Sequence, residues 1–329
     1  MTRTSIPRRA ALVAGLAAAA APPFRRALAA YPDRPVRWIV AYAAGGGTDT
    51  LARILGGSIS PKLGQSVVVE NRPGGATNIG AEAAAKAAPD GHTVFSADNG
   101  TLVFNPVLFR KLPYDPDRDF RPIGLLARFP LILTVKQTSA FGGARDFIEG
   151  AKAKPGQIDC ASPGIGSPHH LAMERLAKET GTRFNHVPYR GAAPALNDLL
   201  AGNVEAMILD LASGRSHLRS GRIKPLAQCS TARHSDLPDV PTVREALGLQ
   251  DFEAYAWQAL MAPARTPDAV AARLTEELAT ALRDDAVIER VREIGLEPLT
   301  GGPEEVTKLI EAERATWVPL IRERGITLE

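Results

Sequence analysis

VRWIVAYAAGGGTDTLARIL, residues 36–55, decides the fold because it joins a strand-like run to a helix-like run through three consecutive glycines. Val36 to Ala41 is rich in β-branched and aromatic residues, as strands are, and the residues after Asp49 follow a helical pattern. Glycine adopts positive φ readily and lets other atoms approach the backbone closely. A helix that begins at such a turn presents unpaired N–H groups and a partial positive charge, so the turn is suited to hold an anion. A tight connection capped by Asp49 explains the same residues and stays open as the alternative.

Short β-branched runs continue to alternate with Ala- and Leu-rich amphipathic stretches along the chain. This alternation is typical of α/β folds with parallel sheets. Residues 100–122, rich in proline and aspartate, are expected to form an irregular connection, and residues 122–137 two strands separated near Phe129. The last part of the chain predicts two helices, over residues 267–284 and 303–324.

Two α/β series on either side of a return crossover predict a bilobal molecule whose first lobe is discontinuous. A chain of roughly three hundred residues is long enough to form two domains. We assign residues 31–133 and 252–329 to lobe 1, and residues 134–251 to lobe 2.

Residues 1–30 have the parts of a secretory signal peptide. Arg8 and Arg9 lie in a basic start, an Ala-rich apolar stretch too short to span a bilayer follows, and small residues supply a cleavage site. We expect the mature chain to begin at Ala30 or Tyr31 and to be periplasmic. The paired arginines suit a twin-arginine route, a Sec route is the alternative, and a retained amphipathic anchor is a third.

The charge of the chain depends on that segment. Residues 1–30 hold five arginines and no acidic residue, so the formal net charge of +3 becomes −2 once they are removed. The basic balance of the whole chain therefore gives no support to nucleic-acid binding.

The two cysteines, Cys160 and Cys229, exclude a disulfide-rich scaffold. We expect two buried free thiols. A disulfide between them stays open, because spacing along the chain does not show whether their Cα atoms are close enough.

Two further strand-to-helix turns resemble the first one. ASPGIGSPHHL, residues 161–171, places Ser167 at a good N-cap position, and VPYRGAAPAL, residues 187–196, places Gly191 at the turn. Ligands of parallel α/β domains bind at the carboxyl ends of the strands, where these turns lie. Three such turns in two lobes predict a cleft that offers N–H groups to both ends of a small anion.

Other chemistries fit these residues poorly. No lysine follows the glycines, as a nucleotide-binding P-loop needs, and the G-x-G-x-x-G spacing of dinucleotide sites is missing, so no cofactor is expected. Adjacent residues of a helix point about 100° apart, so His169 and His170 rarely share a metal ion, and no metal is expected. One of the two is expected to face the cleft or solvent while the other packs. Tyr255 and Trp257 are expected to pack in the core or hinge rather than against a ligand.

The residues also carry a resemblance to a family. YPDRPVRWIVAYAAGGGTDTLAR, GQSVVVENRPGGATNIGAEAAAKAAPDGHT, NPVLFRKLPYDPDRDF, PGIGSPHHL, HVPYRGAAPALNDLLAG and LPDVPTVREALG are similar, in this order, to segments of the Bug family. Bug proteins are the extracytoplasmic solute-binding proteins of tripartite tricarboxylate transporters. The resemblance implies a type II periplasmic-binding-protein fold, with two α/β lobes joined by crossover strands. It also implies that a carboxylate-bearing metabolite binds between the lobes.

Carried onto this sequence, the resemblance marks three turns and one strand end as the ligand-binding site. Asp210 lies where some members have an acidic or amide side chain. A role as cap of the next turn explains this aspartate equally well. The candidate residues are Tyr42, Ala44, Gly45, Gly46, Gly47, Thr48, Asp49, Ser162, Gly164, Gly166, Ser167, His170, Tyr189, Gly191 and Asp210.

Four positions depart from the family pattern. Ala41 replaces the usual proline before the first turn, Leu209 lies where many members have aspartate, and Ala259 and Arg265 interrupt the W-x-G-L-x-A-P-A-G-T-P motif. The fold expectation is unaffected, but the identity of the ligand stays open among di- and tricarboxylates, amino acids and aromatic acids.

The residues and the resemblance together predict a monomeric, non-enzymatic binding protein that delivers a carboxylate to the membrane subunits of a tripartite tricarboxylate transporter. A periplasmic sensor that presents its closed form to a signalling partner is the first alternative. An exported hydrolase that uses Ser162 or Ser167 as nucleophile is the second.

Overall fold

The computed structural model describes residues 31–328. The expected signal peptide lies outside the described residues. Within them, no helix combines the length and the apolar character that crossing a bilayer would need.

The first series of elements builds a parallel sheet with its glycine turn at the carboxyl edge. Strand β1 (Val36–Val40) pairs in parallel with β2 (Val67–Asn71) on one side and β3 (Thr93–Asp98) on the other. Helix α1 (Gly47–Leu63) follows β1, as the composition predicts, and helix α2 (Asn78–Ala85) follows β2. The connection after β3 contains three short helices, η1 (Gly100–Phe104), α3 (Asn105–Leu108) and α4 (Pro116–Asp119). The expectation of an irregular connection over 100–122 is therefore wrong, because η1 is wholly buried and packs as an element of the core.

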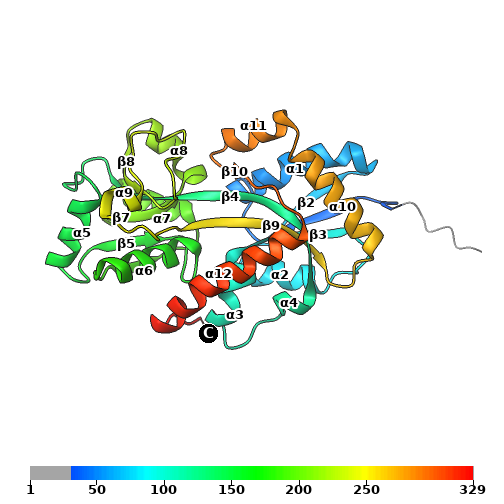
Figure 1. The fold of residues 1–329 in the computed structure, drawn as a ribbon, viewed down its shortest axis with the longest axis horizontal. Coiled ribbons are helices and arrows are strands. Elements are labelled where there is room, and N and C mark those ends of the chain that lie inside the picture. The colour runs from blue at the N-terminus through cyan, green and yellow to red at the C-terminus, as the bar shows by residue number, and fades with distance from the viewer. Residues whose placement is uncertain (1–30, 329) are drawn as a thin grey trace, which may run out of the picture.

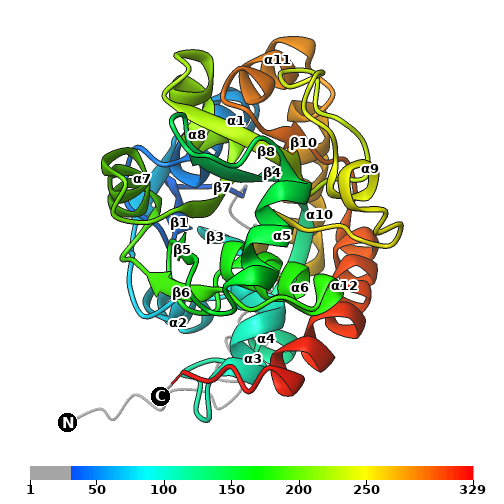
Figure 2. The same ribbon diagram turned by 90° about the vertical axis from the view of Figure 1, so that its left-hand side faces the viewer.

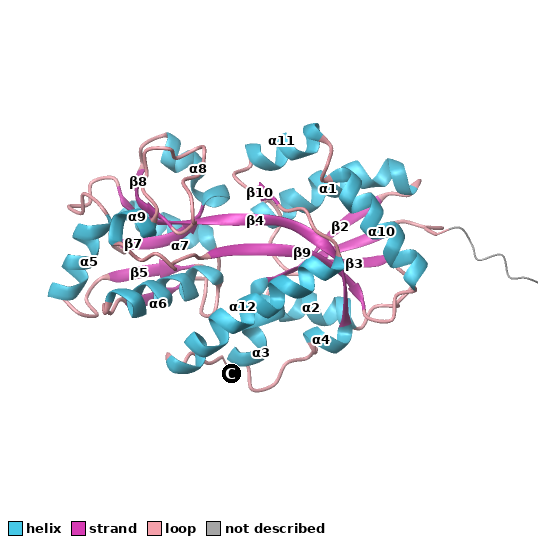
Figure 3. Ribbon diagram, viewed as in Figure 1, coloured by secondary structure: helices cyan, strands magenta, loops and turns pink. Residues whose placement is uncertain are grey.

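A single long strand links the two halves of the molecule. Strand β4 (Phe120–Lys136) has 17 residues, so the expected break near Phe129 is wrong. Its first part pairs with β9 (Tyr255–Pro263) as far as Pro130, and from Leu131 onward it pairs with β7. Proline has no N–H to give to a ladder, and Pro130 falls where β4 exchanges one partner for the next. Figure 1 and Figure 3 show β4 and β9 running beside each other along the length of the molecule.

The second series surrounds the far part of β4. Strands β5 (Asp159–Ser162), β6 (Asn185–Pro188) and β7 (Ala206–Asp210) continue the sheet, and β8 (Ile223–Gln228) pairs with β4 antiparallel. The helices of this series are α5 (Ala144–Ala153), α6 (Pro168–Thr180), α7 (Ala192–Ala201), α8 (Leu211–Arg219) and α9 (Val243–Leu247).

Alternate residues of β5 and β7 point into two different cores. Cys160 and Ile208 join the large core that includes α5 and α6, whereas Ala161 and Met207 join a smaller core with α7. Figure 2 shows α5 and α7 on opposite sides of these strands. Both faces of the sheet are thus covered, as expected for a parallel sheet.

The chain returns to the first lobe through β9 and ends in helices. These are α10 (Asp268–Ala281), α11 (Asp285–Glu293) and α12 (Pro303–Glu323), with the short strand β10 (Glu297–Pro298) before α12. The two expected helices are confirmed as α10 and α12, and α11 was not predicted. The architecture has two α/β lobes joined by β4 and β9, and the residue bounds given above for each lobe stay a prediction.

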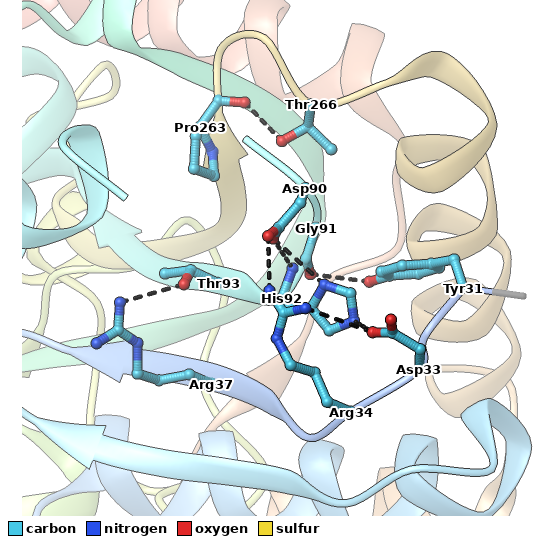
Figure 4. Close-up of polar contacts among 10 residues, drawn as sticks. All are labelled: Tyr31, Asp33, Arg34, Arg37, Asp90, Gly91, His92, Thr93, Pro263 and Thr266. Atoms are coloured by element: carbon cyan, nitrogen blue, oxygen red, sulfur yellow. Dashed lines mark hydrogen bonds and ion pairs between the residues drawn. The ribbon is translucent and has the colours of Figure 1, made fainter. Parts of the chain in front are cut away.

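The edge of the first sheet opposite the glycine turn is tied together by polar contacts (Figure 4). The Tyr31 hydroxyl donates to the carbonyl of Gly91 at 2.9 Å, and His92 lies between Asp33 and Asp90 at 3.0 and 3.3 Å. Gly91 has φ +85°, and a Cβ there would lie 2.2 Å from Val270. These contacts hold the start of β1 in place. The candidate site lies at the other end of this strand.

Candidate functional site

The glycine turn opens helix α1 with its backbone exposed. Gly45 adopts φ +86°, which favours glycine, whereas Gly46 is the N-cap of α1 with φ −78° and ψ 169°. The positive φ of this turn therefore lies at Gly45 and not at Gly46. A Cβ on Gly46 would meet only the carbonyl oxygen of Ala43, at 3.6 Å. Ala44, Gly45 and Gly46 are exposed, so the first N–H groups of α1 are open to a ligand.

Asp49 braces this turn instead of capping the helix. Its carboxylate accepts from the backbone N–H of Gly45 at 2.9 Å, from Arg53 at 2.9 and 3.0 Å and from Asn71 at 2.9 Å. Burial acts to raise the pKa of Asp49, but the hydrogen bonds from Arg53, Gly45 and Asn71 outweigh it and lower that pKa. The N-cap alternative for Asp49 is wrong, and Gly45 gives its N–H to the protein rather than to a ligand.

The turn also rests on the crossover strands. Gln258 of β9 donates to the Thr48 hydroxyl at 2.5 Å. A Cβ on Gly47 would lie 3.1 Å from the ring of Phe129 and 3.3 Å from Ala212, so glycine lets β4 and α8 approach the start of α1. Thr48 and Gly47 therefore connect the candidate site to both halves of the molecule.

The second turn lies between β5 and α6. The Ser167 hydroxyl accepts the N–H of His170 at 3.2 Å, and Pro168 occupies the first turn of the helix, which confirms the predicted cap. Gly164 and Gly166 have φ +155° and +74°, and a Cβ on Gly166 would lie 2.4 Å from Leu108. This turn of the second series thus packs against α3 of the first.

The Ser162 side chain is buried beneath the second turn and forms hydrogen bonds there. It is 1% exposed, lies 2.7 Å from Nε2 of His186 and donates to the carbonyl of Gly164 at 3.0 Å. Burial, followed by the effect of His170, lowers the pKa of His186 to about 4, so the imidazole is neutral. A hydroxyl this buried holds the turn in shape.

The two adjacent histidines of α6 have different surroundings. His170 stacks on His186 with ring centroids 3.8 Å apart, accepts the N–H of Gly166 and approaches Glu174 at 3.6 Å. His169 instead lies 3.3 Å from the carboxylate of Asp210. One of the two histidines packs, as expected, and it is His170, the candidate chosen. His169 lies beside Asp210 at the end of β7.

Asp210 ends β7 and caps the next helix, which confirms one of the two roles considered for it. It accepts the backbone N–H of Ser213 at 2.8 Å as the N-cap of α8, and it also pairs with His169. Burial acts to raise the pKa of Asp210, but His169 and Ser213 outweigh it and lower that pKa.

The third turn adjoins the second. Tyr189 and Gly191 donate their backbone N–H groups to the carbonyls of Ser162 and Pro163 at 2.9 and 3.0 Å. The Tyr189 hydroxyl reaches Asp198 on α7 at 2.5 Å, and burial and this carboxylate raise the pKa of Tyr189 to about 12. The structure therefore brings the second and third turns together and connects them through His169 to Asp210.

Tyr42 contacts the end of the neighbouring strand β3. It follows β1, is 37% exposed and donates its hydroxyl to Asp98 at the end of β3. Burial of the hydroxyl, then Asp98 and Asp210, raise the pKa of Tyr42 well above its usual value. Asp210 of the second lobe thus contributes to the raised pKa of a tyrosine in the first lobe.

Sequence reasoning missed two features of this region. Asp98 is a buried carboxylate at a strand end, and the rule that ligands bind at such ends could have found it. A cavity of about 490 Å³ also opens between the glycine turn and α8, where Arg215 and Arg219 line it with Ser213. In residues 31–328 no group of three or more His, Cys, Asp or Glu side chains is placed to hold a metal ion. Cys160 and Cys229 are both buried and free, which confirms the expected thiols.

Comparison with known proteins gives one consistent result. Residues 51–326 match the model of the tripartite tricarboxylate transporter family receptor. Protein BugT of Bordetella pertussis is 35% identical over 300 residues, which cover 91% of this chain and 92% of BugT.

Two solved structures are also similar to this chain. Rpa4515 of R. palustris with adipate is 35% identical, with a TM-score of 0.85, over 90% of this chain and 99% of that one. MatC of Rhodopseudomonas palustris with bound malate is 32% identical, with a TM-score of 0.80, over 88% of this chain and 100% of that one. The likeness confirms the predicted type II periplasmic-binding-protein fold.

Proposed function

Because this chain belongs to the tripartite tricarboxylate transporter receptor family, we propose that it captures a small carboxylate between its lobes and delivers it to the membrane subunits of such a transporter. Members of this family are solute-binding receptors rather than enzymes, so the hydrolase alternative is set aside. The family proteins are periplasmic, and we propose that this chain reaches the periplasm through the signal peptide expected in residues 1–30.

One observation carries the proposal. Helix α1 begins at an exposed glycine turn whose Gly45 N–H is already bound by Asp49, so the N–H groups from Gly46 onward remain for an anion. The proteins similar to this chain hold adipate and malate, which are both carboxylates. A carboxylate at the start of α1 would also gain from the partial positive charge of the helix end.

We propose a ligand site built from all three turns. The turn at Gly45 to Gly47 would bind one carboxylate, and the turns at Ser167 and Gly191 would close over the ligand from lobe 2. Tyr42, His169 and Asp210 would lie beside the ligand, and we propose that the receptor acts as a monomer. A sensor that signals through its closed form remains the alternative, since capture of the ligand would be the same.

Substitution of Gly46 tests the proposed site. The unliganded backbone accepts a side chain here, because φ is −78° and the nearest atom to a Cβ is 3.6 Å away. Gly46→Val should therefore fold and melt cooperatively, while its side chain covers the N–H groups of α1. Ligands at 100 times their dissociation constant add about 2.7 kcal/mol to folding, which is a rise of several degrees in Tm.

The measurement is a thermal-shift screen of carboxylates on the wild type and on this variant. Gly57→Val is a matched control, since Gly57 lies within α1 and a Cβ there meets open space. At least one carboxylate should raise the Tm of the wild type and of Gly57→Val but not that of Gly46→Val. Equal stabilisation of all three proteins would show that the glycine turn does not bind the ligand.

A further inference from the structure

The cavity beside the glycine turn has helix α8 of lobe 2 as its other wall. Its volume is about 490 Å³, which is large enough for a small organic acid. The glycine turn lines it from lobe 1, and α8 lines it with Ala212, Ser213, Arg215, Ser216 and Arg219. In Figures 1 and 2, α8 lies on the same side of β4 as α11, which adds Glu293 and Ile294 to the lining.

The side of α8 that lines the cavity is basic. Ala212, Arg215, Ser216 and Arg219 are spaced by three, four and seven residues, so they share one face of the helix. Apart from Ala212, this face consists of two guanidinium groups and a hydroxyl, all of which donate hydrogen bonds. The buried residues of α8, Leu211 and Gly214, lie outside this spacing. The basic face is therefore left for the cavity.

Arg215 is held in place by the protein and still has donors to offer. Its side chain is 17% exposed, its Nε lies 2.8 Å from the Asp236 carboxylate, and its Nη1 donates to the carbonyl of Arg292 at 3.1 Å. Within residues 31–328, Nη2 of Arg215 makes no hydrogen bond or ion pair. An arginine that is already fixed loses little side-chain entropy when it binds a ligand.

Arg219 adds a second positive charge one turn further along the same face. Its side chain is 66% exposed, and its Nη2 lies 3.9 Å from Asp236, so this ion pair is weak. Glu293 is the acidic member of the lining. Two arginines and one glutamate give the lining a formal charge of 2 − 1 = +1, and the start of α1 adds its partial positive charge.

We infer that Arg215 and Arg219 are specificity-determining residues that bind a second anionic group of the ligand, while its first carboxylate binds at the glycine turn. The inference rests on the proposed function and specifies the ligand class, an acid with an anionic group at each end. It also extends the site beyond the three turns, because neither arginine is among the residues that the sequence marks.

Isothermal titration on ligand-free protein tests the inference with acids that differ only in the second charge. The probes are the straight-chain diacids from succinate to pimelate and their monomethyl esters. Each ester keeps the chain length and one carboxylate of its diacid. For the chain length that fits the cavity, the wild type should bind the diacid at least 10-fold more tightly than the ester, which is about 1.4 kcal/mol.

Three variants identify the residues responsible for this preference. Arg219→Gln and Arg215→Gln should each remove most of it. Since Arg215 also contacts Arg292 of lobe 1, a purely structural role would weaken diacid and ester alike and leave the preference unchanged. Arg222→Gln is the matched control, because Arg222 is exposed, follows α8 and lies outside the lining of the cavity. It loses the same charge and should keep the preference of the wild type.

Glu293→Gln tests the sign of the charge effect. This change removes the carboxylate from the lining, so a second anionic group should meet less repulsion and the preference for the diacid should rise. A preference that stays the same or falls would contradict the inference.

The possible results are distinct. Esters that bind as tightly as the diacids, or a preference that survives unchanged in Arg219→Gln or in Arg215→Gln, would overturn the inference and leave the proposed function standing. An equal loss in Arg222→Gln would reveal a general effect of net charge and would overturn it too. If the wild type binds neither diacids nor esters, the inference fails, and the thermal-shift screen with Gly46→Val decides the proposed function separately.

Discussion

Trp257 of the crossover strand β9 donates its indole N–H to Glu313 of helix α12 at 3.0 Å, and both side chains are buried. Trp317 donates to the same carboxylate oxygen at 3.2 Å, and the amide of Asn99 lies at 3.4 Å from it. Asn99 directly follows Asp98, so this cluster joins the strand ends of the candidate site to the last helix. Figure 1 shows α12 lying alongside the crossover strands.

The charge state of Glu313 should make stability depend on pH. Burial raises the pKa of Glu313 above 4.5, although the three donors oppose the shift. The folded state therefore binds this proton more tightly than the unfolded state, so the associated stability is complete below pH 4.5 and is lost as the pH rises through the folded pKa. Glu313→Gln keeps an acceptor for the indoles and cannot ionise. Its Tm relative to the wild type should rise between pH 4.5 and 8, and a constant difference would contradict the assignment.

Loss of the Asp49 brace should weaken both fold and binding. Asp49→Ala leaves the Gly45 N–H and the Arg53 guanidinium without their partner, and we expect a loss of about 1–3 kcal/mol in unfolding free energy at pH 7. Since the pKa of Asp49 is lowered in the folded state, its contribution is present above pH 3.8 and is lost as the pH falls. Urea unfolding at pH 7 and pH 3 measures this, and the difference between variant and wild type should shrink at pH 3.

Both thiols should be unreactive until the protein unfolds. Burial raises the pKa of Cys160 and of Cys229 to about 12, so neither forms the reactive thiolate at neutral pH. Titration with a thiol reagent should detect no fast reaction in the native protein and two thiols in denaturant. Detection of two thiols only after a reductant is added would reveal a disulfide instead.

Ligand should favour a more compact form. The lobes are joined by β4 and β9, which can bend while each sheet stays intact, and Arg215 of α8 already reaches the carbonyl of Arg292 in α11 at 3.1 Å. Small-angle scattering with a saturating ligand should give a smaller radius of gyration than without it. An unchanged radius would indicate a site formed before the ligand arrives.

The sequence predicts the individual helices and strands of this fold better than it predicts which strands pair with one another. Three glycines after a β-branched run indicate a turn, and Ser167 before Pro168 indicates a helix start, because both signals are local. Pro130 suggests a strand end for the same reason. The strand continues because its partner changes from β9 to β7 at that residue, and no local pattern shows a change of partner.

The roles of single site residues depend on packing between distant segments. His169 and His170 are equivalent in the sequence, and the stacking of His170 on His186 of β6 decides which one faces Asp210. Asp98 is followed by Asn-Gly and suggests a simple turn, so its burial beside Tyr42 becomes visible only in the structure. The positive φ at Gly45 accompanies a hydrogen bond from its N–H to Asp49, and this bond is likewise not visible in the sequence.

Strand β4, which both lobes share, also determines the order in which parts of the molecule can fold during synthesis. Phe120 at its start pairs with Pro263, 143 positions later, and Leu131 pairs with Asp210. Contacts of such long range form slowly, because the intervening chain must first be closed into a loop. A nascent chain that has not yet reached β9 leaves the edges of β3 and β4 without their partner. The lobe that begins first is therefore completed last, and the chain stays open through most of its own translation.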